Sequence, residues 1–149
     1  MASILLVNDD EQFRNTLSET LRRAGYKVLE AHDGAEGLRF YRKHATDLMI
    51  TNLIMPEKEG LEIIQELRRH DPEVKIIAIS SGARHGSDDY ATIAKTFGLQ
   101  RVLAKPFSRQ EMLDAVWQVL EAQEQKAWQS AEKRGASIKN IHTIHEVVA

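Results

Sequence analysis

The sequence predicts an α/β fold in which five parallel strands form a doubly wound sheet with helices packed against it. Two observations support this prediction. Short apolar runs alternate along the chain with segments whose apolar residues recur at helical spacing. The apolar runs are also nearly continuous, as is typical of strands that are buried on both faces. Strands that alternate with helices in this way join through right-handed crossovers into a parallel sheet.

The composition limits the class of protein. The chain has 149 residues, of which 42% are hydrophobic, and this is enough for one domain with its own core. Its 20 basic and 22 acidic residues give a formal charge of -2, so we expect no direct contact with nucleic acid or an anionic membrane. The chain has no cysteine and no apolar run near the ~20 residues of a membrane span, and its first residues lead us to expect no signal peptide. We therefore expect a cytoplasmic protein without disulfides.

The first two strand–helix units occupy the beginning of the chain. An apolar run over residues 4–7 predicts the first strand. The apolar pattern that follows is helical and is closed by Gly25, a residue type that favours the position after a helix end. Alternation over residues 26–31 predicts the second strand, and Asp33 is expected to cap a helix that extends to about His44.

The stretch over residues 47–56 organises the rest of the chain. Its apolar run ends on Asn52, and Pro56 stops the run four residues later. This pattern predicts a buried parallel strand that places Asn52 at its carboxyl end, where ligands and chemistry gather in open α/β sheets. A helix is expected from about Gly60 and stops before Pro72.

Two further units follow. Residues 74–79 predict the fourth strand, and the helix after it is closed by Gly98. Residues 101–104 predict the fifth strand, and Ser108 with Glu111 forms a capping box for the last helix. The inner face of that helix is expected to consist of Met112, Ala115, Val116, Val119 and Leu120.

The domain is expected to occupy residues 1–122, and residues 123–149 form a C-terminal extension. The segment 121–134 favours helix but lacks a broad apolar stripe, and Trp128 is the large apolar residue in its second half. Apolar residues recur at short spacing after residue 136, which suits an amphipathic helix or a docking or oligomerisation segment. The extension is too short to fold alone.

Polar residues lie at the ends of four of the expected strands. They are Asn8, Asp9, Asp10, Asn52, Ser80, Ser81 and Lys105. The carboxyl ends of parallel strands meet at one rim, so these side chains are expected to converge. Carboxylate oxygens hold Mg²⁺, while a hydroxyl and an ammonium group hold phosphoryl oxygens. Each residue alone is an ordinary cap or turn residue, but four strand ends together favour a site.

The succession ILLVNDD, DLMITNLIMPEKEG, IIAISSG and VLAKPF closely resembles the receiver domains of bacterial response regulators, over about residues 3–122. The resemblance implies a flavodoxin-like (βα)₅ fold with strand order 2-1-3-4-5. It also implies a role in two-component signal transduction. In that role, an aspartate at the end of the third strand accepts a phosphoryl group from a histidine kinase, and acidic residues after the first strand hold Mg²⁺.

The resemblance assigns positions to individual residues. Asn52 stands at the phosphoacceptor position. Asn8 stands at the first of the two acidic positions after the first strand, and Asp9 stands at the second. Ser80 and Lys105 match the hydroxyl and the lysine that hold the phosphoryl group.

Further positions follow from the same resemblance. The backbone carbonyl of Ile54 is the remaining metal ligand. Val102 occupies the aromatic switch position, so an aromatic rotamer switch is not expected. With an amide at Asn52, the carboxylate nucleophile that phosphotransfer needs is missing. Mg²⁺ is expected to bind weakly, because each lost charge pair is worth roughly 4 kcal/mol at ~4 Å. Asn52 can then accept a hydrogen bond from Lys105.

These residues leave more than one function open. The first hypothesis is a signalling module that works without phosphorylation or is disabled, either as a natural pseudo-receiver or as a receiver whose acids were changed. The alternative is a flavodoxin-like module that binds a small ligand or nucleotide at the same rim, although no glycine-rich phosphate loop follows the first strand. The chain shows no trustworthy order of nucleophile, base and acid, so an enzyme is not expected.

The partner predicted by the resemblance is a histidine kinase or another signalling protein. The family's usual dimer face consists of the helix before residue 98, the strand over 101–104 and the last helix, so a homodimer is a second prediction. A charged face that is simply solvated is an equally good reading. The candidate contacts are Asp88, Asp89, Lys95, Arg101, Glu111 and Trp128.

Overall fold

The computed structural model describes residues 1–53, 60–80 and 87–133, without the side chains of 87–91, 123–127, 130 and 131. Five parallel strands form one sheet in the order β2-β1-β3-β4-β5, which confirms the predicted fold class and strand order. The strands are β1 (Ser3–Val7), β2 (Lys27–Ala31), β3 (Leu48–Asn52), β4 (Ile76–Ser80) and β5 (Arg101–Ala104). The helices are α1 (Glu11–Arg23), α2 (Gly34–Lys43), α3 (Gly60–His70), α4 (Ser87–Phe97) and α5 (Arg109–Lys133).

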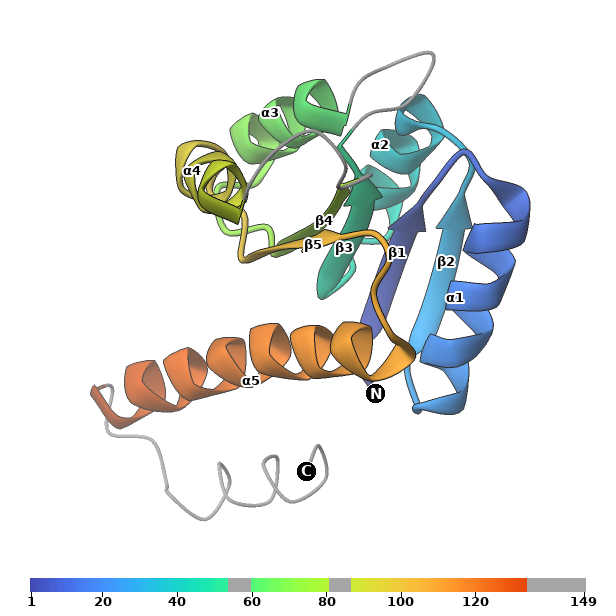
Figure 1. Ribbon diagram of the computed structural model, residues 1–149. Coiled ribbons are helices and arrows are strands. Elements are labelled where there is room, and N and C mark those ends of the chain that lie inside the picture. The colour runs from blue at the N-terminus through green and yellow to red at the C-terminus, as the bar shows by residue number, and fades with distance from the viewer. Residues whose placement is uncertain (54–59, 81–86, 134–149) are drawn as a thin grey trace.

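The helices cover both faces of the sheet (Figure 1). Helices α1 and α5 pack on one face, where Leu21 and Val116 are completely buried against Ile4 and Ile50. Helices α2, α3 and α4 lie on the other face. The five predicted inner-face residues of α5 are all buried, which confirms that part of the helical pattern. The central strands are therefore apolar on both sides, as their continuous runs predicted.

The second strand begins one residue later than expected, because the end of α1 uses Tyr26. The Gly25 N–H donates to the Arg22 carbonyl at 3.0 Å, and the Tyr26 N–H donates to the Leu21 carbonyl at 3.2 Å. This pair of hydrogen bonds is a Schellman motif, and it needs a left-handed residue at Gly25, whose φ is 99°. Lys27 is then the first residue free to pair with β1.

The fourth strand is shifted toward the carboxyl terminus relative to the expected range 74–79. Val74 is buried, but its N–H donates to the Asp71 carbonyl at 3.2 Å and so belongs to the turn after α3. At the other end the ladder includes Ser80, which pairs with Ala104. The apolar character of Val74 thus reflects burial in a turn and does not reflect strand pairing.

The predicted helix caps are confirmed. The Asp33 carboxylate accepts the Glu36 N–H at 2.8 Å at the start of α2. At the start of α5, Ser108 Oγ accepts the Glu111 N–H at 3.0 Å and Glu111 Oε1 accepts the Ser108 N–H at 3.3 Å, which completes the capping box. These contacts satisfy amide groups that have no partner inside the helix.

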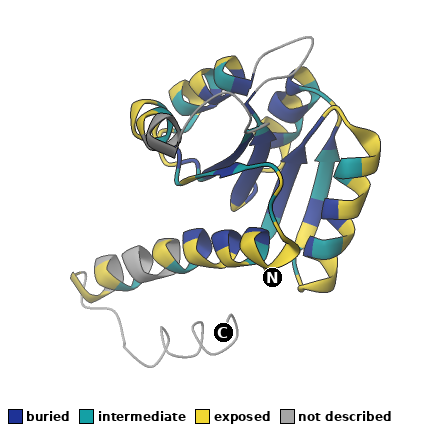
Figure 2. Cartoon of the chain, in the orientation of Figure 1, coloured by how far each residue is buried: buried dark blue, intermediate teal, exposed yellow. Residues whose placement is uncertain are grey.

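Helix α5 runs through residue 122 without a break. Burial is confined to its first half, and every side chain described between 121 and 133 is exposed or only partly buried (Figure 2). Trp128 is one of the partly buried residues. The expected amphipathic segment after residue 136 lies outside the described residues. Among the helices the structure describes, none is both long and apolar enough to cross a bilayer.

Candidate functional site

The carboxyl ends of β1, β3, β4 and β5 lie along one rim of the sheet, as the sequence predicted. Val7 pairs with Thr51, so the residues that follow them, Asn8 and Asn52, extend from neighbouring strands. Ser80 is the last residue of β4, and its carbonyl accepts the N–H of Lys105 at 2.8 Å. The rim therefore carries these residues in the spatial order of the strands.

Three of the predicted residues are joined by side-chain hydrogen bonds. Asn8 Nδ2 donates to Asn52 Oδ1 at 3.1 Å, and Asn52 Nδ2 donates to Asp9 Oδ1 at 3.3 Å. We call Asn8, Asn52 and Asp9 the amide chain. Asn8 Oδ1 also accepts the Asp10 N–H at 2.9 Å, so both ends of the Asn8 amide have partners. Asn8 is completely buried, and a buried amide without partners would be costly.

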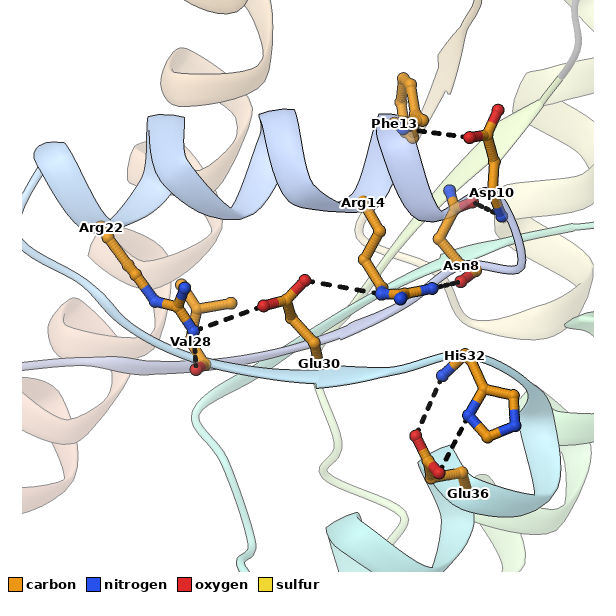
Figure 3. Close-up of polar contacts among 9 residues, drawn as sticks. All are labelled: Asn8, Asp10, Phe13, Arg14, Arg22, Val28, Glu30, His32 and Glu36. Carbon is orange, nitrogen blue, oxygen red and sulfur yellow. Dashed lines mark hydrogen bonds and ion pairs between the residues drawn. The ribbon is translucent and has the colours of Figure 1, made fainter.

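The Arg14 side chain contacts the backbone of the amide chain at Asn8. Its Nη1 donates to the Asn8 carbonyl at 2.8 Å, and its Nε lies 3.5 Å from the Glu30 carboxylate (Figure 3). Glu30 also lies 3.5 Å from Arg22, which donates to the Val28 carbonyl. Helix α1 is thus tied to the backbone at the end of β1. Neither Arg14 nor Glu30 was predicted from the sequence, because a charged pair between a helix and a strand has no local sequence signature.

Asp10 serves the helix that follows the site. Its Oδ1 accepts the Phe13 N–H at 3.1 Å, which makes Asp10 the N-cap of α1 (Figure 3). Asp9 and Asp10 are both exposed, but Asp10 accepts from the backbone of α1, whereas Asp9 accepts from the side chain of Asn52. The two neighbouring acids therefore differ in their hydrogen-bond donors.

The ammonium group of Lys105 lies over an aromatic ring. Its Nζ is 4.0 Å from the centroid of Phe13, and Phe13 meets Phe107 edge to face at 6.0 Å. Such a contact stabilises a cation through the negative face of the ring. The hydrogen bond that we expected from Lys105 to Asn52 is not formed, since the Lys105 ammonium group lies over Phe13 and Asn52 Oδ1 accepts from Asn8. The Phe13 position gave no sequence signal of this contact.

Gly60 holds the backbone at the end of β3. Its N–H donates to the Leu53 carbonyl at 2.8 Å, and a Cβ at this position would overlap the carbonyl oxygen of Asn52. The same Cβ would lie 2.8 Å from the Asn52 carbonyl carbon. A glycine is therefore required for α3 to begin so close to Asn52. The sequence placed the helix start here but did not reveal this approach.

The remaining predicted positions are less informative. Ser80 is partly buried at the end of β4 and its side chain makes a further contact. Val102 is partly buried in β5 and packs against the core beneath α2, α3 and α4. Ile54 and Ser81 lie outside the described residues.

Comparison with known proteins then identifies the family. The sequence model of the response regulator receiver domain matches residues 4–117. This chain belongs to the response regulator receiver family. The receiver is 37% identical over 114 residues to a response regulator receiver protein of Anaeromyxobacter sp. (strain Fw109-5), a match that covers 76% of this chain and 47% of that one.

Other relatives cover different shares of their own length. The receiver is 33% identical to the transcriptional regulatory protein GlrR of Escherichia coli (strain K12) over 80% of its own length and 26% of GlrR. It is 31% identical to the chemotaxis protein CheY of Halobacterium salinarum, with 80% of this chain and 97% of CheY covered. The receiver thus spans about half or less of the first two relatives.

Solved structures agree with the sequence relatives. A response regulator receiver domain protein from Clostridium thermocellum aligns with a TM-score of 0.75 at 28% identity, covering 83% of this chain and 98% of that one. The response regulator TrrA from Thermotoga maritima, in complex with Mg(2+)-BeF, aligns with a TM-score of 0.71 at 28% identity, covering 80% and 100%. The receiver is therefore a two-component response regulator module in both sequence and fold.

The residues predicted for the dimer face occupy different surroundings. Lys95 is exposed on α4 and lines a groove shared with α3. Arg101 Nη1 donates to Gln118 Oε1 at 2.5 Å, which links β5 to α5. Trp128 lies on the outer part of α5 and makes a further contact. The side chains of Asp88 and Asp89 lie outside the described part of the chain.

Proposed function

We propose that this receiver signals through protein contacts and does not accept a phosphoryl group at Asn52. The observation that supports the proposal is the amide chain. Asn52 Oδ1 is an acceptor for Asn8, and Asn52 Nδ2 is a donor to Asp9, so both side-chain atoms of Asn52 are engaged. A neutral amide oxygen is also a far weaker nucleophile than a carboxylate. The module on this proposal is a binding protein and has no catalytic activity of its own.

The same residues fit Mg²⁺ poorly. Asn52 turns the hydrogens of its amide toward Asp9, where a cation would need oxygen. The Asn8 oxygen accepts the Asp10 N–H, and the Asp10 carboxylate caps α1. Asp9 is the carboxylate of the amide chain, and Mg²⁺ prefers several oxygen ligands in octahedral geometry. We propose that Mg²⁺ binding is weak, and no step of the function depends on it.

The partners follow from the family. We propose a histidine kinase or another signalling protein as the partner, and a homodimer through α4, β5 and α5 as the assembly. The part of α5 beyond Leu120 supports the second proposal, because its described side chains are exposed or only partly buried. Trp117, which is 42% exposed on the same helix, adds an apolar group to this surface. Light scattering over a range of concentrations tests the dimer, and a monomer at the highest concentration would contradict it.

A nucleotide or flavin at the rim finds less support. Asp9 and Asp10 would repel a phosphate group there, and a groove of about 740 Å³ lies instead at the amino ends of the strands. A thermal-shift screen with flavin mononucleotide and nucleotides tests this alternative. Stabilisation that depends on Asp9 or Asn52 would favour it over signalling by contact.

The experiment that tests phosphorylation uses acetyl phosphate and Mg²⁺, followed by intact-mass spectrometry. We expect no added phosphoryl group on the parent chain and one on the double variant with Asn8→Asp and Asn52→Asp. The control is Asn15→Asp, which adds one of the two negative charges of the double variant at an exposed position of α1 and should gain no phosphoryl group. A phosphoryl group on the parent chain would overturn the proposal.

A further inference from the structure

A second surface lies at the amino ends of the strands, opposite the rim that carries the amide chain. Helices α3 and α4 lie side by side on one face of the sheet (Figure 1). Their carboxyl-terminal halves enclose an open groove of about 740 Å³. Helices of a parallel α/β sheet run opposite to its strands, so this groove lies at the amino ends of the strands. It is therefore separate from the rim that carries Asn8 and Asn52.

The floor of the groove is apolar and rigidly supported. Ile64 is nearly completely buried on α3, and Phe97 is partly buried on α4. Gly98 closes α4 with a φ of 67°, a conformation that a side chain would strain. The volume of the groove is within the range of about 300–1,000 Å³ that is typical of ligand sites. An apolar side chain of a partner fits such a floor.

One cation of the groove is fixed in place. Arg68 donates through Nη1 to the carbonyls of Pro72 and Val74 at 3.0 and 2.8 Å, and through Nη2 to the Gly98 carbonyl at 2.5 Å. Its Nε is buried and has no hydrogen-bond partner within the described ranges. Arg68 thus joins the end of α3 to the end of α4, and among the described residues its charge forms no ion pair at the groove.

Two more cations line the groove and have no ionic partner. Arg69 and Lys95 are exposed, and in the described parts of the chain neither forms an ion pair or a side-chain hydrogen bond. The other polar lining residues, Gln65 and Thr96, are neutral. The whole chain carries a net charge of -2, so three cations without an acid around one apolar floor is a local reversal of charge.

Helix dipoles account for part of this pattern. Cations in the last turn of a helix are stabilised by the helix dipole, and α2 also ends in the cations Arg42 and Lys43. The dipole does not explain why the cations of two helices surround one apolar hollow. That combination is complementary to a ligand that is both acidic and apolar.

We propose that the groove between α3 and α4 binds an acidic peptide segment of a partner protein, with one apolar side chain on the floor and carboxylates beside Arg69 and Lys95. Electrostatic complementarity of this kind speeds association and selects the partner, while the buried apolar anchor holds it. The groove is distinct from the amide chain, so the proposal does not depend on the absence of phosphorylation.

The test uses the full chain labelled with ¹⁵N and a short acetylated, amidated peptide of glutamates with a leucine at its centre. We expect saturable shifts in the backbone NMR signals of α3 and α4 in ~0.15 M salt, where charges more than ~8 Å apart are largely screened. The double variant Arg69→Glu, Lys95→Glu should bind the peptide at least about tenfold more weakly. Replacing the central leucine by serine should also abolish saturation.

The matched control is the double variant Arg42→Glu, Lys43→Glu at the end of α2, which changes the net charge equally and leaves the groove intact. This control should bind the peptide as the parent does. Equal weakening in both double variants would show unspecific attraction and overturn the proposal. The proposal would also be overturned if the peptide shifted NMR signals outside α3 and α4. The same holds if inorganic phosphate or ATP, but not the peptide, shifted the signals of groove residues, or if a second copy of the chain occupied the groove.

Discussion

Replacing Asn8 by aspartate tests whether the amide chain stabilises the fold. In the parent, the Asn8 amide donates to Asn52 Oδ1 at 3.1 Å. Asn8→Asp removes the donor and turns a buried oxygen toward another oxygen. We expect the variant to be less stable than the parent in EDTA at neutral pH, and the reason is both a lost hydrogen bond and a new like-charge pair.

The size of the effect follows from the contacts. The lost hydrogen bond is worth about 1 kcal/mol. The new carboxylate lies within roughly 9 Å of Asp9, since hydrogen bonds of 3.1 and 3.3 Å join the two residues through the oxygen and nitrogen of the Asn52 amide. At that separation, repulsion is about 2 kcal/mol at an effective dielectric of ~20 and below 1 kcal/mol if water screens the exposed Asp9. A total loss of about 2–3 kcal/mol lowers the melting temperature by about 5–10 °C.

The assay is thermal or urea unfolding with EDTA, with Mg²⁺ and across pH. Mg²⁺ should stabilise the variant more than the parent, by about 2.7 kcal/mol at a hundredfold excess over the dissociation constant. Burial raises the pKa of the new carboxyl group above ~3.9 in the folded state, so the folded state binds more protons than the unfolded state. The loss of stability should therefore shrink as pH falls toward 4 and grow as pH rises.

The control is again Asn15→Asp, which should change stability by less than about 0.5 kcal/mol. If Asn8→Asp is as stable as the parent in EDTA at neutral pH, the amide chain does not stabilise the site. A loss that is insensitive to both Mg²⁺ and pH would point to a packing defect, and the electrostatic reasoning would then be refuted.

Three other changes test neighbouring parts of the structure. Gly60→Ala should destabilise the fold by at least about 3 kcal/mol and broaden the NMR signals around Asn52, because the new methyl group overlaps the Asn52 carbonyl; a melting temperature equal to the parent's would contradict this. Burial and the hydrogen bond to Asp71 raise the pKa of Tyr41, so the parent should lose stability as pH rises above ~10. Tyr41→Phe should remove that loss, and it should lower the free energy of unfolding at neutral pH by about 1 kcal/mol in urea titrations. Lys105→Met should cost about 0.5–1 kcal/mol through the lost cation–π contact, and an unchanged urea midpoint would show that the contact contributes nothing.

The meeting of Asn8 with Asn52 at one rim was predictable, because parallel strands bring their carboxyl ends to the same rim. The order of the strands followed from the resemblance to receiver domains and not from the sequence pattern. The caps were predictable as well, since a capping residue and its helix are close in sequence. The direction of Lys105 was not predictable. It depends on Phe13, which reaches the same place from a helix far away in the sequence, and periodicity carries no information on such a meeting.

The contacts of Arg14 were also not predictable from local sequence patterns. Its partners are the carbonyl of Asn8 and the carboxylate of Glu30, and neither contact follows from the helical pattern that predicted α1. Gly60 was expected near a helix start, but only the placement of the Asn52 carbonyl shows why no side chain fits there. Local rules therefore predicted where the elements end, and tertiary contacts decided what each end residue does.

The internal hydrogen bonds of the amide chain bear on how a signal is transmitted. Carboxylates at the positions of Asn8 and Asn52 would repel one another and Asp9, and a bound cation would be needed to hold them together. With amides, donors and acceptors alternate from Asn8 through Asn52 to Asp9, so these three side chains have hydrogen-bond partners without a cation. A site whose geometry does not depend on a cation has no reason to change shape when Mg²⁺ arrives. On the proposed function, any change of state in this receiver must then come from differential binding of a partner protein, because a ligand shifts an equilibrium only by its preference for one state.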